Sequence, residues 1–358
     1  DGNNSAVTGG IGTEELTDIT SSIVVNIPFD KDSLERTLNV DFGFDAYSSA
    51  SSDQIDGQAN SSASSADTRT HLNATWSTKN TKNFTWSASV YLSTEYDYNS
   101  VGFGAGFSKA SLDNNREVGV SANVYVDQWQ IIRPTELRGL SPDPSSGRNS
   151  YSLSWYYSQV ATRKLQWSIS SDVVYQSGFL STPFHRVYFG DIAQNFPGDV
   201  GTEALPGSRL KLPIGIRANY FMNDLIVLRS YYRYYWDDWD LTAHTVSLEM
   251  PIKLSPFFSV YPFYRYYKQS AAKYFAPYDT HISTEEFYTS DYDLSSFDSH
   301  FYGGGIRYAP IDGLWKFKNL ISKKNRMLHS VELRYGMYNR SNGLDSNIVS
   351  VHFKFKNQ

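Results

Sequence analysis

The 358-residue sequence contains no cysteine and no long uninterrupted apolar run. The absence of cysteine excludes a disulfide scaffold, a thiolate metal site, a cysteine nucleophile and a c-type haem attachment site. A membrane-spanning helix needs about 20 consecutive, predominantly apolar residues, and no segment approaches that length. The sequence therefore excludes a helical membrane protein.

Charged side chains are also scarce. They make up 19% of the chain, against about 25% in typical soluble domains. The formal net charge of −5 gives no reason to expect nucleic acid as a partner. Aromatic residues are abundant at 16%, yet the mean hydropathy is only −0.44. This combination indicates a chain that presents apolar side chains to lipid only at every second residue.

Apolar and polar residues alternate over long segments of the chain. Between residues 116 and 130, for example, Val118, Val120, Val124 and Val126 occupy alternate positions. Such alternation places one set of side chains on each face of a strand. The runs last about 10–15 residues, which is the length of a tilted strand that crosses a membrane together with its rims.

The alternation predicts fifteen strands, and the connections between them are short and long in turn. Short turns on one side and long loops on the other are typical of outer-membrane β-barrels. We therefore expect residues 1–358 to form a single all-β domain, a transmembrane antiparallel β-barrel in the bacterial outer membrane. The long loops are expected at about residues 49–66, 131–147, 179–208 and 272–297. The predicted strands cover residues 17–27, 35–48, 67–78, 83–97, 100–112, 116–130, 148–161, 164–178, 209–221, 225–239, 241–254, 257–271, 298–310, 327–340 and 346–356.

An odd number of strands conflicts with the even number that single-chain bacterial barrels usually have. If the turn that follows residues 17–27 is periplasmic, one ascending strand should lie upstream of Asp1 or be missing from this chain. We therefore expect sixteen strands in all. The sequence does not open on a basic, apolar leader, so we expect the signal peptide of an exported protein to have been removed already.

The segment 313–326 is rich in lysine, and Leu314, Phe317 and Ile321 would share one face of a helix. This pattern predicts a short basic amphipathic segment that lies on anionic inner-leaflet headgroups. The alternative is a solvated periplasmic loop.

Five segments carry distinctive motifs: TGGIGTEEL at 8–16, DAYSSASSD at 45–53, YYRYYWDDW at 231–239, TAHT at 242–245 and SDYDLSSFDSH at 290–300. With these motifs the chain resembles an uncharacterised family of Gram-negative outer-membrane proteins, catalogued as a domain of unknown function. The resemblance covers essentially the whole chain. It implies an outer-membrane barrel, no agreed active site, and a genomic association with flavin-transferase and thioredoxin-like proteins.

Residues of opposite parity to the lipid-facing set should face the lumen of the barrel. An arginine that faced lipid at mid-bilayer would cost about 2–4 kcal/mol, so the arginines of the strands are expected to point inward. In the C-terminal half the inward charged residues are Arg217, Arg229, Arg233, Glu249, Arg265, Arg307, Glu332 and Arg334.

Two nearly identical segments, YYRYY at 231–235 and FYRYY at 263–267, centre on Arg233 and Arg265. Both lie on ascending strands, so we expect the two arginines at similar height on one wall. One interpretation is an arginine ladder that binds an anion, a carboxylate or a phosphate. Another is an internal salt-bridge network, and a third is a site for a sugar or an aromatic ligand. The inward aromatic neighbours are expected to be Tyr231, Tyr235, Phe263 and Tyr267, and the carboxylates of the network Asp237, Glu249, Asp298 and Glu332.

The long loops are acidic, and carboxylate oxygens are the ligands that calcium prefers. The candidates for a calcium site are Asp237 and Asp238 in one group and Asp291 and Asp293 in another, with no EF-hand spacing. The alternatives are solvated loop charge and bridging to lipopolysaccharide phosphates.

The leading functional prediction is porin-like passage or binding of a small polar or anionic solute through an arginine- and tyrosine-lined lumen. The alternative is a non-conducting structural or accessory subunit of a larger outer-membrane complex, and the resemblance alone implies a third, a conduit for a redox partner. No nucleophile elbow, HExxH motif or Gly-rich phosphate loop occurs, so neither an enzyme nor a cofactor is expected. The expected partners are outer-membrane lipid, lipopolysaccharide and other outer-membrane or lipoprotein subunits.

Overall fold

The computed structural model describes residues 2–13, 15–29, 34–48, 66–139, 145–318 and 325–357. Strands dominate these residues, and the helices among them are the 3-10 turns η1 (Ala6–Thr8), η2 (Thr135–Leu137) and η3 (Tyr292–Leu294). No helix of the described residues is long and apolar enough to cross a membrane. The strands are β1 (Asp18–Pro28), β2 (Glu35–Ser48), β3 (Ala66–Lys79), β4 (Phe84–Thr94), β5 (Tyr98–Ala110), β6 (Arg116–Trp129), β7 (Ser146–Thr162), β8 (Leu165–Gly178), β9 (Arg186–Tyr188), β10 (Val200–Thr202), β11 (Ser208–Phe221), β12 (Val227–Asp237), β13 (Thr242–Glu249), β14 (Ile252–Lys253), β15 (Phe258–Gln269), β16 (Phe297–Tyr308), β17 (Trp315–Lys318), β18 (Asn325–Arg340) and β19 (Asp345–Asn357).

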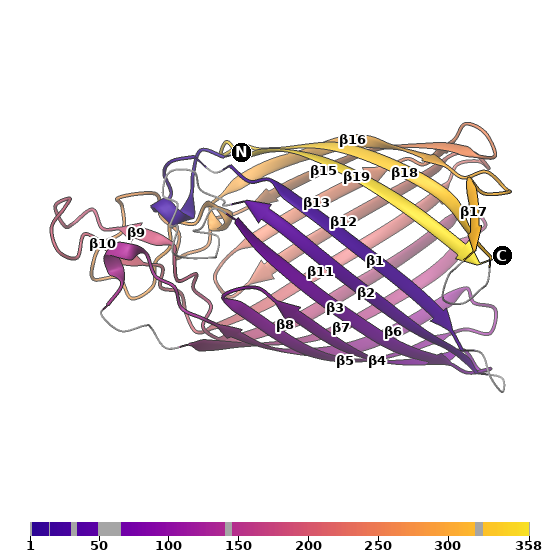
Figure 1. Ribbon diagram of the computed structural model, residues 1–358, viewed down its shortest axis with the longest axis horizontal. Helices are drawn as coiled ribbons and strands as arrows, with labels where there is room; N and C mark the ends of the chain where they lie inside the picture. The colour runs from indigo at the N-terminus through magenta and orange to yellow at the C-terminus, as the bar shows by residue number, and fades with distance from the viewer. Residues whose placement is uncertain are drawn as a thin grey trace.

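One antiparallel sheet of 17 strands contains every strand except the β9–β10 hairpin. Each long strand pairs with the next long strand in the sequence, from β1–β2 to β18–β19, and β8 pairs with β11 across the loop that holds the hairpin. Figure 1 shows the sheet curled into a tilted, barrel-like wall around a lumen. The loop end of this wall carries β9 and β10, and the turn end carries the C-terminus.

The strands lie where the alternation predicts them, but the sheet has 17 strands where the alternation predicts fifteen within this sequence. The predicted strand 241–254 is interrupted after β13, because Pro251 has no N–H to donate to the ladder, and it resumes as β14. The other additional strand is β17, which pairs with β18.

Strand β17 also corrects the predicted amphipathic segment at residues 313–326. Trp315 and Phe317 alternate with two lysines, and this period of two is typical of a strand. The same segment also has the helical spacing of Leu314 and Phe317, so the sequence alone fits both structures. Pairing of Trp315 with Leu328 and of Phe317 with Arg326 selects the strand. The predicted contribution of Ile321 lies outside the described residues.

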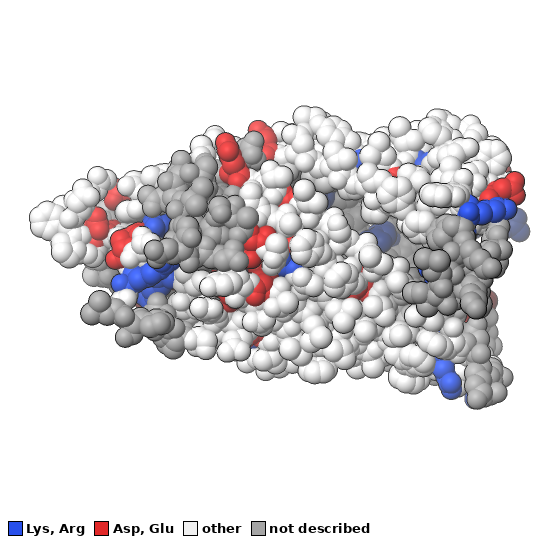
Figure 2. Space-filling model, in the orientation of Figure 1, with Lys and Arg blue, Asp and Glu red and all other residues white. Residues whose placement is uncertain are grey.

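In the part of the chain that the structure describes, each of the two end strands of the sheet forms a ladder on one side only. Within the described ranges, β1 pairs with β2 and β19 with β18, and no ladder joins β1 to β19. Figure 1 shows β1 and β19 as neighbours on the near wall, both directed toward the turn end. Every residue of β1 is exposed, and Figure 2 shows this wall hollowed, with Lys or Arg atoms visible inside. The predicted sixteenth strand remains a prediction, and its place would be this seam.

The outer face of the sheet is apolar. Trp86, Phe103 and Leu153 are 50%, 59% and 52% exposed, and each alternates with a polar or small residue that faces the lumen. Charged side chains gather toward the two ends of the wall (Figure 2). A soluble monomer rarely exposes a contiguous apolar surface of more than a few hundred Å², and such a surface marks contact with protein or membrane.

The two long loops between β8 and β11 and between β15 and β16 fold against one another at the loop end. Ala204 and Tyr288 exchange two backbone hydrogen bonds, of 3.1 and 2.7 Å, and Phe189 forms a parallel bridge with His281. Figure 1 shows that the β9–β10 region extends beyond the wall rather than into the lumen.

Candidate functional site

The arginines of the candidate site come from four strands in one part of the sheet. Arg217 lies on β11, Arg229 on β12, Arg265 on β15 and Arg334 on β18. Their neighbours of opposite parity, such as Tyr264, lie on the outer face. The pleat of each strand therefore directs the guanidinium groups into the lumen while the tyrosines cover the outside.

These arginines line one cavity of about 710 Å³. Four guanidinium groups face a single carboxylate, that of Glu249, in its lining. The cavity is therefore strongly cationic. The lining residues that the sequence predicted are Arg217, Arg229, Tyr231, Glu249, Phe263, Arg265 and Arg334.

Two phenylalanine rings form an apolar floor of the cavity. The ring centroids of Phe263 on β15 and Phe301 on β16 lie 5.0 Å apart. They lean over Gly303 and Gly336, which are register partners. A Cβ at Gly336 would lie 2.6 Å from Phe301 Cε2, and a Cβ at Gly303 would lie 2.1 Å from a backbone oxygen. Glycine at these positions is what allows the rings to lie so close to the backbone.

The aromatic rings hold the arginines by cation–π contacts. The guanidinium carbon of Arg265 lies 5.0 Å from the centroid of Phe301, and that of Arg217 lies 5.4 Å from the centroid of Tyr231. A guanidinium that stacks on a ring by its face keeps its N–H edge free for hydrogen bonds. That edge matches the two oxygens of a carboxylate or phosphate.

Only some of the arginines in the cavity have a carboxylate partner. Arg229 Nη1 lies 2.8 Å from Glu249 Oε1, and Arg334 donates to the other oxygen of Glu249. Arg334 Nε also lies 3.4 Å from Glu332. Among the described residues, no carboxylate pairs with Arg217 or Arg265. The cavity thus combines the predicted salt-bridge network with two arginines that are free to meet an anion.

Arg233 and Arg265 do not lie in one row of the β-ladder, although their segments are nearly identical. Arg233 on β12 pairs with Thr245 on β13, and Thr245 pairs with Tyr267 on β15. Arg265 on β15 pairs with Ser247 on β13, and Ser247 pairs with Tyr231 on β12. The two arginines are therefore displaced by two residues, and each shares its row with a tyrosine. The reason is the register of β13 between them, which repetition of the segments does not determine.

Tyr235 and Tyr267, predicted as ligand contacts, lie at the loop end in an apolar cluster. The buried centre of the cluster is formed by Trp239, Leu241, Ala243 and Ala272, and loop residues Leu180, Leu205 and Leu294 also pack against it. The hydroxyl of Tyr235 donates to Asp237 at 2.7 Å and that of Tyr267 to Gln269 at 2.6 Å. These tyrosines therefore anchor the loops to the inner face of the sheet. Arg307, near the turn end of β16, does not line the cavity.

The four aspartates predicted as calcium ligands have different partners and do not form one site. Asp237 is fully buried and accepts hydrogen bonds from Arg209, Tyr235 and the backbone of Trp239. Asp238 accepts a hydrogen bond from the backbone of Leu210, and Asp293 pairs with Arg340 at 2.6 Å. Asp291 belongs to a different group, which the sequence did not reveal.

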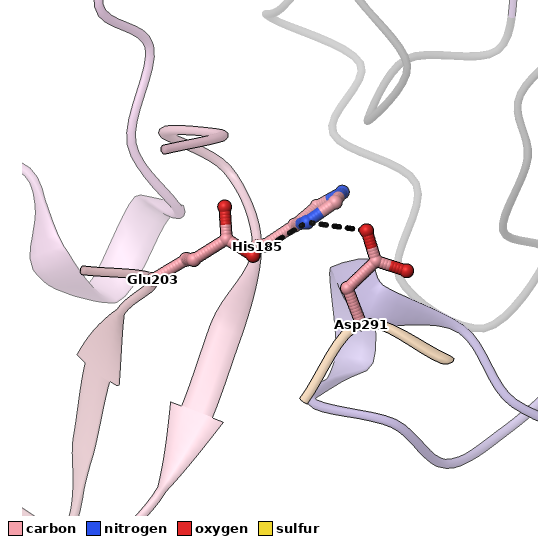
Figure 3. Close-up of side chains that lie close together, drawn as sticks. All are labelled: His185, Glu203 and Asp291. Atoms are coloured by element: carbon pink, nitrogen blue, oxygen red, sulfur yellow. Dashed lines mark ion pairs between the residues drawn. The ribbon is translucent and has the colours of Figure 1, made fainter. Parts of the chain in front are cut away.

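This group joins Asp291 to His185 and Glu203 at the loop end (Figure 3). His185 Nδ1 lies 3.7 Å from Glu203 Oε1 and 3.9 Å from Asp291 Oδ2. Burial raises the pKa of Asp291 to about 6. Burial acts against the charged imidazole of His185, but the neighbouring carboxylates of Glu203 and Asp291 outweigh it and raise the pKa of His185.

A second group consists of Asp67, Glu95 and Asp97, where β3 and the β4–β5 turn meet. Asp97 is 4% exposed, and its Oδ2 receives no hydrogen bond from any residue of the described ranges. Burial, together with the neighbouring Asp67 and Glu95, raises the pKa of Asp97 to about 7. The carboxylate of Glu95 lies 3.6 Å from Arg69, which offsets part of this negative charge.

Comparison with known proteins assigns a family to the chain. The model of the family described as "Protein of unknown function (DUF3570)" matches residues 44–318, and the chain belongs to this family. Membership confirms the resemblance that the sequence motifs carry. No curated protein matches the chain.

Three solved structures are similar over most of the chain. The siderophore receptor PirA from Pseudomonas aeruginosa is 11% identical, with a TM-score of 0.45, over 95% of this chain and 61% of the receptor. A BenF-like porin from Pseudomonas fluorescens Pf-5 is 9% identical, with a TM-score of 0.43, over 95% of this chain and 91% of the porin. BamA from Haemophilus ducreyi lacking POTRA domains 1-3 is 7% identical, with a TM-score of 0.43, over 96% of this chain and 71% of that BamA chain. The chain spans about three fifths of the length of the siderophore receptor.

Proposed function

We propose that this member of the DUF3570 family is an outer-membrane β-barrel that binds small anionic solutes in its arginine-lined cavity and lets them pass. Carboxylates and phosphates are the solute class that this cavity suits. The observation that carries the proposal is the pair Arg217 and Arg265, which face the lumen beside aromatic rings and have no carboxylate partner among the described residues.

The outer-membrane location is supported by the outer face of the sheet. Large apolar side chains on this face, such as Phe103 and Phe107, are more than half exposed. Burial of apolar surface is worth about 25 cal/mol per Å², so a belt of such residues favours transfer into lipid. Strands of about 11–14 residues, such as β4 and β6, match the length that a tilted membrane strand with its rims requires. We place the loop end outside the cell, because outer-membrane barrels carry their long loops there.

The cavity suits a small anion better than a neutral or cationic solute. Arg229 and Arg334 share the charge of Glu249, so their attraction for an anion is partly cancelled. Arg217 and Arg265 have no carboxylate partner among the described residues, and both side chains are exposed to the space that a solute would enter. A charge-assisted, bidentate hydrogen bond from arginine is about twice as strong as a neutral hydrogen bond.

Liposome swelling tests the solute class. Proteoliposomes that contain the full-length protein are placed in isotonic solutions of a small dicarboxylate, a neutral polyol of equal size or a diamine of equal size. The proposal predicts the fastest swelling with the dicarboxylate and the slowest with the diamine. Equal rates for the three solutes, or faster entry of the diamine, would contradict it.

A second candidate is a non-conducting barrel that serves as a subunit of a larger outer-membrane complex with other barrel or lipoprotein subunits. The observation that favours it is the apolar cluster around Trp239 and Leu241, which joins the long loops to the inner face of the sheet. If that cluster closes the lumen, none of the three solutes will enter the liposomes, and the protein will instead co-purify with partner subunits in stoichiometric amounts.

A further inference from the structure

The group formed by His185, Glu203 and Asp291 brings together two long loops that are far apart in the sequence. His185 directly precedes β9 and Glu203 directly follows β10, and the backbone N–H of Glu203 donates to the carbonyl of His185 at 3.0 Å. Asp291 directly precedes η3 in the other loop. In Figure 3 the imidazole nitrogen lies between the two carboxylates.

Hydrogen bonds fix both carboxylates in orientation. Glu203 is 6% exposed, its Oε2 accepts from the backbone of Thr182 at 2.6 Å, and its Oε1 accepts from the hydroxyl of Thr289 at 2.5 Å. Asp291 Oδ1 accepts from the backbone of Asp293 at 2.9 Å, which leaves Oδ2 directed toward His185. Such outer hydrogen bonds are the usual support of metal-binding carboxylates.

The distances within the group are too long for direct hydrogen bonds. A charged N–H···O hydrogen bond has a length of about 2.8 Å. His281, in the loop that carries Asp291, forms such a contact with Glu285 at 2.5 Å. His185 Nδ1 stays 3.7 and 3.9 Å from its two carboxylates. It is buried, and none of the described residues forms a hydrogen bond with it.

These separations are close to those between ligands of one metal ion. With bonds of about 2.0–2.2 Å, neighbouring ligands of a tetrahedral ion lie about 3.4 Å apart. The two distances from His185 Nδ1, 3.7 and 3.9 Å, exceed this value by only a few tenths of an ångström. All three ligand atoms lie within 4.8 Å of one another, so the two carboxylates would have to approach each other by at most about 1.4 Å. One imidazole and two carboxylates suit a first-row ion such as Zn²⁺, whereas Ca²⁺ takes oxygen ligands.

We propose that His185, Glu203 and Asp291 bind a divalent first-row metal ion of the Zn²⁺ type, which ties the two long outer loops together. A polar cavity of about 100 Å³, lined by His185, Asp291, Asp293 and Arg340, adjoins the group and has room for a water molecule as a further ligand. The inference is independent of solute passage, because the metal holds the loops whether or not the lumen conducts.

Metal binding is measured on the full-length protein in detergent, stripped with EDTA and then dialysed against micromolar Zn²⁺ in one arm and Ca²⁺ in another. We expect one Zn²⁺ per chain and no stoichiometric Ca²⁺. His185→Gln and Asp291→Asn should each reduce Zn²⁺ affinity at least tenfold. Glu286→Gln, a matched carboxylate-to-amide change at an exposed position of the loop that carries Asp291, leaves the three ligands and the adjoining cavity in place and should retain it. Glu203 is not substituted, because its carboxylate also holds Thr182 and Thr289.

Co²⁺ provides a readout that a purely structural role would not produce. The Co²⁺-loaded protein should show visible d–d absorption bands that disappear in His185→Gln and persist in Glu286→Gln. Zn²⁺ should also slow proteolysis of the loops in the wild type and have no such effect in His185→Gln, whose folding is checked by its heat-dependent shift on a gel. Equal Zn²⁺ binding by wild type and His185→Gln, or no stoichiometric binding by wild type, would overturn the proposal.

Discussion

Glu249 on β13 joins Arg229 on β12 to Arg334 on β18: its Oε1 lies 2.8 Å from Arg229, and its Oε2 accepts a hydrogen bond from Arg334. One carboxylate thus partly neutralises two guanidinium groups of the cavity. It therefore limits the excess of positive charge in the lining of the cavity.

Glu249→Gln should make the cavity more cationic. We expect a stronger anion preference, measured as the reversal potential across a planar bilayer. We also expect a loss of stability of about 1 kcal/mol, because the pairs are partly exposed and such pairs are individually weak. Glu332→Gln is the control, since Glu332 contacts Arg334 at 3.4 Å but does not line the cavity. An unchanged or weaker anion preference in Glu249→Gln would contradict this role.

The seam between β1 and β19 should hold one further strand. Val25 and Val40 are register partners on β1 and β2, so the double variant Val25→Cys/Val40→Cys should form a disulfide. Cysteine at Val25 combined with cysteine at Val349, Val351 or Phe353 of β19 should not, because an intervening strand separates the two edges by about 10 Å. The chain has no native cysteine to interfere.

Amide exchange distinguishes a further strand from an open gap. If a strand occupies the seam, the N–H groups of β1 that point away from β2 will be protected in the full-length protein. Ready disulfide formation between β1 and β19, or fast exchange of these N–H groups, would refute the sixteenth strand.

Asp97 should make the protein less stable as the pH rises. Burial raises its pKa from 3.8 to about 7, so the folded state binds more protons than the unfolded state between these values. The free energy of unfolding therefore falls as the pH rises from about 4 through 7. The gain in melting temperature from Asp97→Asn should be larger at pH 8 than at pH 5, in EDTA.

Asp113 in the β5–β6 turn is the matched control for Asp97. Hydrogen bonds from Ser111 and Asn115 lower its pKa to about 2. Stability from this group is present above the unfolded pKa of 3.8 and is lost only as the pH falls toward 2. Asp113→Asn should therefore show no difference in its effect between pH 5 and pH 8. A gain from Asp97→Asn that does not depend on pH would contradict the account.

The strands could be predicted from the sequence because a sheet with one apolar and one polar face imposes a period of two on every strand. The predicted strand at residues 35–48 has the bounds of β2, and the inward parity that placed Arg217 and Arg265 in the lumen also applies to Phe301. The same rule does not determine register. The offset of Arg233 from Arg265 depends on β13, which contributes the intervening residue of each row.

The loop-end group could not be predicted, because loops have no periodicity. His185 and Asp291 meet through the β9–β10 hairpin and the backbone bridge between Ala204 and Tyr288, and no local pattern encodes either contact. In the sequence, Asp291 is distinguished only by its charge, as one of several acidic loop residues. The tertiary contacts, and not the spacing of the residues, select the histidine and the glutamate beside it.

The most direct test of the central claim is the reversal potential of Arg217→Gln/Arg265→Gln in a bilayer with a KCl gradient. We predict that wild type prefers anions and that the double variant loses most of this preference. Arg163→Gln, which removes an exposed arginine in the turn between β7 and β8, should behave as wild type. The same anion preference in wild type and double variant would contradict an arginine-lined path for anions.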